Sequence, residues 1–220
     1  MYKLVKREKV NKNINSVISL LLSITEFSPI KKNILDKAKN IKFKNDELLI
    51  TYFDKIFTES DDDIIKLFQY DYYTKIVCLY GKNMTNKFTS SIIILTVTSN
   101  TDVKLLLNDI KEFIDADNGH EICKISDTSE MGYGPFYREN CYDIPSVNRY
   151  LLIFLNKNNY KHSVNLNYDI VVDNYHYILD GIIIITNGNS KYIKVIDESY
   201  NSFENRQNAV ILLYRRQLIF

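Results

Sequence analysis

The sequence is poor in the residues on which specialised scaffolds and many enzyme motifs depend. Its 220 residues contain no tryptophan, three prolines, three cysteines and six glycines. Three cysteines are too few for a disulfide framework, which predicts a reduced intracellular protein, cytoplasmic or nuclear, with buried thiols. The sequence has neither a glycine-rich phosphate loop nor a G-x-S-x-G turn, so it offers no motif for nucleotide binding or serine hydrolysis.

Long apolar runs and an excess of one charge are also missing. The apolar stretch from Val17 to Ile24 is too short to span a bilayer, so no membrane association is expected. Lys and Arg total 28 against 27 Asp and Glu, a net charge of +1. This balance does not predict nucleic-acid binding, although the basic arm from Met1 to Lys12 keeps it open. Three histidines without H-x-x-x-H or C-x-x-C spacing predict no metal or other cofactor.

The residues that are abundant indicate a globular protein. The chain has 30 Ile, 24 Asn, 22 Lys and 17 Tyr but only 3 Ala, a skew that follows the AT-rich codons of an AT-rich genome. A hydrophobic fraction of 45% with 13% aromatics is enough to build a core and excludes a disordered chain.

Hydrophobic periodicity predicts helices early and strands late. Helical spacing covers four stretches: Asn15–Phe27, Asp46–Phe57, Asp61–Phe68 and Val103–Phe113. Strand patterns cover Thr74–Tyr80, Ser91–Thr98, Tyr150–Leu155, Ser163–Val172, Tyr175–Ile185, Tyr192–Ile196 and Ala209–Arg215. The pair Asn187-Gly188 marks a turn within the late strands. This order predicts an α+β fold rather than alternating α/β units.

The order of these segments resembles that of the ubiquitin-specific proteases, the papain-like cysteine proteases that remove ubiquitin. Lys12-Asn13-Ile14-Asn15-Ser16 resembles the C-Y-M-N-S with which the family's catalytic helix begins. Six further segments follow in the family's order: Lys44–Asp54, Ile64–Phe68 with Ile76–Gly81, Cys123–Ser126, Pro145–Leu155, Tyr177–Ile183 with Ile196–Ser199, and Leu213–Arg215. The resemblance covers nearly the whole chain.

The resemblance implies a papain-like α+β fold in a single domain spanning residues 1–220. An N-terminal helical, thumb-like part would cover 1–70, and a fingers-like part with short, degenerate zinc fingers would cover 71–145. A palm-like antiparallel sheet would cover 146–220.

The departures from the family fall on its catalytic and zinc-binding positions. Lys12 occupies the position of the nucleophilic cysteine, and a lysine amine is cationic at neutral pH. The family's G-H-Y, which carries the general base, aligns with Ser190-Lys191-Tyr192 or with a shortened loop at 187–189, and neither contains histidine. Asp197 alone keeps a residue of the family's type. Each C-x-x-C retains one cysteine, Cys78 and Cys123, and two thiolates cannot complete a four-ligand zinc site.

The resemblance therefore implies a catalytically inactive relative that acts by binding ubiquitin or a ubiquitin-like protein. One alternative is an assembly or dormancy factor of a large complex such as the ribosome or proteasome, which uses the fold only as an interaction surface. Another is an active thiol hydrolase with a different site, built from Cys141 with His162 or His176. The sequence shows no activating spacing between these residues.

Overall fold

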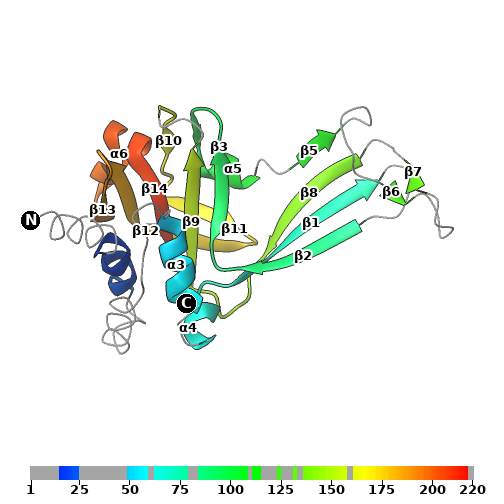
Figure 1. Cartoon of the computed structure of the whole chain (residues 1–220), viewed down its shortest axis with the longest axis horizontal. Helices are drawn as coiled ribbons and strands as arrows, with labels where there is room; N and C mark the ends of the chain where they lie inside the picture. Colours follow the sequence, from blue (N-terminus) through cyan, green and yellow to red (C-terminus); the bar gives the residue numbers. More distant parts are fainter. Residues whose placement is uncertain are drawn as a thin grey trace, which may run out of the picture.

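A computed structural model describes residues 15–24, 49–58, 62–78, 84–108, 111–114, 123–124, 131–132, 136–157 and 161–217. The described residues build two main sheets that meet end to end, with helices gathered around the larger one, and two further pairs of short strands (Figure 1). The fold is thus mixed α and β, as the periodicity predicts. No helix in these ranges is long and apolar enough to cross a membrane.

The larger sheet has six strands and contains most of the C-terminal half of the chain. Its order is β11-β12-β14-β9-β3, and β13 also pairs with β12. The bounds are β3 Ile93–Val97, β9 Tyr150–Lys157, β11 Asp169–Val172, β12 Tyr175–Thr186, β13 Asn189–Lys194 and β14 Ala209–Arg216. All neighbours are antiparallel except β3 and β9, which run parallel.

Alternating strand residues supply two hydrophobic layers, one on each face of this sheet. On one face, Leu152, Ile183 and Leu213 pack with the helix at 15–22, with α3 (Leu49–Thr58) and with the region of α4 (Asp62–Lys66). On the other face the sheet packs with α5 (Val103–Asn108) and with Tyr200 of the 3-10 helix η2 (Glu198–Asn201). A short helix, α6 (Phe203–Asn208), leads directly into β14. The predicted helices of the first third therefore cover a single face.

The smaller sheet has four antiparallel strands in the order β2-β1-β8-β5. The bounds are β1 Tyr70–Cys78, β2 Met84–Ser90, β5 Lys111–Ile114 and β8 Phe136–Asp143. It extends away from the larger sheet, with the two-residue strands β6 (Cys123–Lys124) and β7 (Met131–Gly132) beyond its far end (Figure 1). β2 and β8 have no counterpart among the predicted strands, because their sequences are rich in polar residues and lack a clear apolar alternation.

Two predicted elements are wrong in extent. The predicted helix Val103–Phe113 ends at Asn108, and residues 111–114 instead form β5 against β8. Asn and Asp at 108–109 are poor helix formers, and pairing with β8 overrides the helical spacing of the residues that follow. The predicted strand Ser163–Val172 is divided into β10 (Val164–Asn165), which pairs with β4 (Thr101–Asp102), and β11.

Candidate functional site

The helix at 15–22 meets the β12–β13 hairpin where the resemblance would place a catalytic centre. Val17, Leu20 and Leu21 recur at helical spacing and are fully buried against the sheet. The hairpin turns at Asn187 and Gly188, whose φ angles of 52° and 73° are those of a type I′ turn. This turn sets the register Thr186–Asn189 and fixes which β13 side chains face the helix.

A buried hydrogen bond joins the helix to the hairpin. The Ser190 hydroxyl donates to the Ser16 hydroxyl oxygen at 3.0 Å, across 174 positions of sequence. Both serines are nearly inaccessible, with exposed fractions of 6% for Ser16 and 9% for Ser190. The two segments that the resemblance aligns with the family's first and second catalytic motifs are thus in direct contact, through hydroxyl groups.

Tyr192 lies close to β12 at Gly181. A Cβ atom at Gly181 would lie 2.7 Å from Cε2 of the Tyr192 ring, so this position requires glycine. The Tyr192 hydroxyl oxygen is buried and makes no hydrogen bond of acceptable geometry with the described residues. Burial raises the pKa of Tyr192, and the nearby Ser23 hydroxyl partly opposes this shift. The phenol therefore remains protonated at neutral pH and is not a candidate base.

The three positions that the resemblance aligns with catalytic residues have different structural settings. Lys12 lies outside the described residues. Lys191 is exposed in β13 and, because neighbouring strand residues point to opposite faces, it points away from the helix that Ser190 contacts. Asp197 is exposed at the N-terminus of η2, where its carboxylate accepts a hydrogen bond from the Ser199 N–H at 2.9 Å. Hydrogen bonds from the Ser199 hydroxyl and N–H lower the pKa of Asp197. The described role of Asp197 is to cap this turn.

The two remaining finger cysteines lie in different sheets. Cys78 is the last residue of β1, with its backbone opposite Phe136, whereas Cys123 lies in β6 opposite Gly132. Their side chains are outside what the structure describes, so the prediction that they cannot complete a zinc site stays a prediction. Within the described ranges, no three His, Cys, Asp or Glu side chains come together as a metal site.

The residues of the alternative thiol site occupy separate elements. Cys141 lies in β8, with its backbone opposite Tyr73 of β1, and its side chain is not described. His176 is exposed in β12, and His162 precedes β10 with a buried Nδ1 that has no hydrogen-bond partner among the described residues. An active site built from Cys141 with either histidine stays a hypothesis, and His120 lies outside the described residues.

Sequence reasoning missed two features of this region. The Ser16–Ser190 contact has no signal in a single sequence, because isolated serines carry no periodic or motif information.

A second feature is the group of tyrosines at the junction of the two sheets, Tyr70, Tyr72 and Tyr142. Their ring centroids lie 5.6–5.7 Å apart in the pairs Tyr70–Tyr142 and Tyr72–Tyr142. Because Tyr70 and Tyr72 are two residues apart in a strand, the sequence could have predicted that their side chains lie on the same face of the sheet.

Comparisons with known proteins relate this fold to solved deubiquitinase structures. Neither a protein-family model nor a curated protein sequence matches the chain. The SAGA DUB module of Ubp8, Sgf11, Sus1 and Sgf73 bound to monoubiquitin is similar over 78% of this chain, with a TM-score of 0.52 and 12% identity. The module bound to ubiquitin aldehyde is similar over 78%, with a TM-score of 0.53 and 11% identity. A form with truncated Sgf11 is similar over 70%, with a TM-score of 0.51 and 15% identity.

The similarity extends over part of those proteins. The chain spans about half the length of the solved chains it matches, with 47%, 48% and 42% of them covered. At identities this low, the comparison shows that the folds are similar. It does not show that this chain has the activity of the larger proteins. The described residues have a mixed α and β fold that is distantly similar to a ubiquitin-specific protease module.

Proposed function

We propose that this protein is a catalytically inactive, ubiquitin-specific-protease-like protein that acts inside the cell by binding ubiquitin or a ubiquitin-like protein. The observation that carries the proposal is the similarity of the fold to DUB modules solved with monoubiquitin and ubiquitin aldehyde. A chain that keeps such a fold without its thiol and imidazole retains a binding surface and loses the hydrolytic step.

The side chains at the helix–hairpin contact support inactivity. Papain-type cleavage needs a thiolate formed by a neighbouring imidazole, which then donates a proton to the leaving amine. The resemblance aligns the thiol position with Lys12 and the imidazole position with Lys191 or a shortened loop at 187–189, and neither alignment contains a cysteine or a histidine. At the contact itself the groups are the hydroxyls of Ser16 and Ser190, which hydrogen-bond to each other.

Retention on immobilised ubiquitin tests the binding half of the proposal. Biolayer interferometry with the full chain should give saturable binding to ubiquitin and none to an unrelated protein of similar size and charge. If the chain is not retained by ubiquitin and instead copurifies with one large assembly, the assembly-factor alternative replaces the proposal. Ribosomes and proteasomes are the assemblies to examine first.

A ubiquitin probe that captures active-site thiols tests the inactivity. We expect no labelling of the native chain, and none of a Lys12→Cys variant, because the new thiol has no imidazole to deprotonate it. Labelling of the native chain that is lost in Cys141→Ser would establish the alternative thiol site and overturn the inactive assignment.

A further inference from the structure

The outermost strands of the two sheets follow each other in the chain and meet at a sharp bend (Figure 1). β2 is the last strand of the smaller sheet and pairs with β1 alone, and β3 is the last strand of the larger sheet and pairs with β9 alone. Two residues, Ser91 and Ile92, connect them (Figure 1). Within the described part of the chain, no strand pairs with the outer side of residues 84–97. An unpaired edge of this length presents backbone N–H and C=O groups to an incoming strand.

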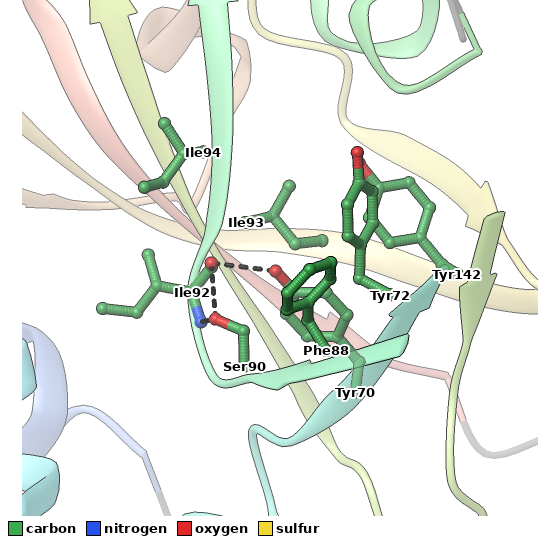
Figure 2. Close-up of a pocket in the computed structure, with 8 residues that line it drawn as sticks. All are labelled: Tyr70, Tyr72, Phe88, Ser90, Ile92, Ile93, Ile94 and Tyr142. Carbon is green, nitrogen blue, oxygen red and sulfur yellow. Dashed lines mark hydrogen bonds between the residues drawn. The ribbon is translucent and has the colours of Figure 1, made fainter. Parts of the chain in front are cut away.

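A pocket of about 290 Å³ lies at the bend between these two strands. Ile93 points from β3 toward Tyr72 and Tyr142, whereas the side chain of Ile94 points to the opposite side of the strand (Figure 2). Phe88 and Ile94 are each 57% exposed at its rim. The complete lining is Tyr70, Tyr72, Phe88, Ser90, Ile92, Ile93, Ile94 and Tyr142.

Hydrogen bonds hold the bend in one geometry. The Tyr70 hydroxyl donates to the Ile92 carbonyl oxygen at 2.9 Å, and the Ser90 hydroxyl donates to the same oxygen at 3.1 Å. The Ser90 oxygen also accepts from the Ile92 N–H at 3.2 Å (Figure 2). Because the backbone groups of Ile92 are satisfied internally, the pocket is formed before any ligand arrives, which limits the ordering cost of binding.

The lining indicates which chemistry the pocket accepts. It contains no carboxylate, amine or guanidinium, and burial raises the pKa of Tyr70 to about 12. Burial also raises the pKa of Tyr142, so both phenols are neutral. The nearest cation on β2, Lys87, is on the opposite face and pairs with Asp71 at 2.7 Å. A volume at the lower limit of ligand pockets suits one bulky, uncharged side chain better than a cofactor.

From the open edge of β3 and the uncharged pocket beside it, we propose that β3 binds an extended peptide segment of a partner protein as a strand added along residues 93–97. One large apolar side chain of that segment fills the pocket between Phe88, Ile93 and Tyr142. The hydroxyls of Tyr72 and Tyr142, which make no hydrogen bond with another described residue, lie at this pocket and can donate to peptide carbonyls. Backbone pairing supplies affinity in this mode and the pocket supplies selectivity.

A peptide series with one variable position tests the proposal on the full chain. The probe is a fluorescein-labelled peptide, Lys-Thr-Val-Thr-Phe-Thr-Val-Thr-Lys, and its relatives replace the central Phe by Ala or Asp. Fluorescence anisotropy should show at least tenfold tighter binding of the Phe peptide than of either relative. Phe88→Ala should weaken binding at least fivefold, whereas Leu105→Ala, which removes an equally exposed side chain on α5, should leave it unchanged.

Hydrogen exchange of the backbone amides tests whether the peptide binds as an added strand. Strand addition predicts added protection of amides within 93–97 when the Phe peptide binds, and loss of binding when alternate peptide nitrogens are methylated. Absence of binding by the whole series overturns the proposal, and so does binding without protection of 93–97. Tighter binding of decaproline would assign the pocket to a polyproline segment instead. Dimerisation of the chain that Phe88→Ala abolishes would assign the edge to a second copy.

Discussion

Gly181 is the residue at which the hairpin leaves no room for a side chain. In Gly181→Ala the new Cβ would meet the Tyr192 ring at 2.7 Å, and the ring and strand would have to shift. We expect a loss of about 1–3 kcal/mol in the free energy of unfolding, measured by urea denaturation. In a Tyr192→Ala background the same substitution should cost much less, and equal costs in both backgrounds would contradict the contact.

Lys157 gives the chain a predictable pH dependence. Its Nζ donates to the carbonyl oxygens of Arg206 and Gln207 at 3.0 and 2.7 Å, and burial lowers the pKa of Lys157 to about 8. An unfolded lysine titrates near pH 10.4, so between about pH 8 and 10 the unfolded chain binds more protons and stability rises with pH. Partial solvation limits this rise to about 1–2 kcal/mol.

The matched variant is Lys157→Met, which keeps the aliphatic stem and removes the amine. Unfolding free energies at pH 7.5 and 9.5 should show the rise in the native chain and a smaller rise in the variant. Taking the difference between the two proteins removes the contribution of the cysteines and the N-terminus. If the unfolding free energy of the native chain and of Lys157→Met rose by the same amount between the two pH values, the Lys157 amine would be solvated in the folded protein.

At the scale of elements, the packing of the 15–22 helix on β13 depends in part on one buried pair of hydroxyls. Ser16→Ala or Ser190→Ala should each destabilise the fold, because each deprives the other buried hydroxyl of this partner. The double variant should lose less than the sum, with a coupling energy of about 0.5–1.5 kcal/mol by denaturant unfolding. Thr98→Ala, at an exposed position, should change stability by less than about 0.5 kcal/mol. Additive losses would show that the two elements are not coupled here.

The elements also show what the sequence could and could not predict. Val17, Leu20 and Leu21 carry a clear helical period, and the apolar runs of β12 and β14 carry a clear strand signal, so these elements follow from local pattern. β2, β5 and β8 do not, because their polar residues are held by pairing with distant strands. The helix–hairpin contact was predictable only in part: the resemblance brings the two motifs together, but it does not indicate that two serines make the contact. The tyrosine-lined pocket depends on the meeting of two sheets, which no local pattern encodes.

At the scale of the whole molecule, the fold is similar to DUB modules, and the positions that the resemblance aligns with the family's catalytic cysteine and histidine contain neither residue. The helix–hairpin contact joins the helix at 15–22 to β13. The open edge at 84–97 belongs to other elements, β2 and β3. Binding of ubiquitin and binding of an added strand are two separate predictions, and each has its own measurement.

The central claim is that this fold binds ubiquitin without cleaving it, and ubiquitin carrying a C-terminal rhodamine amide reports both events in one sample. Titration with the full chain should raise the anisotropy of the dye to a plateau, while the fluorescence increase that accompanies amide cleavage stays absent over many hours. Release of the dye by the native chain, lost in Cys141→Ser, would contradict the claim of inactivity. An anisotropy that does not change at any concentration of the chain would contradict the claim of binding.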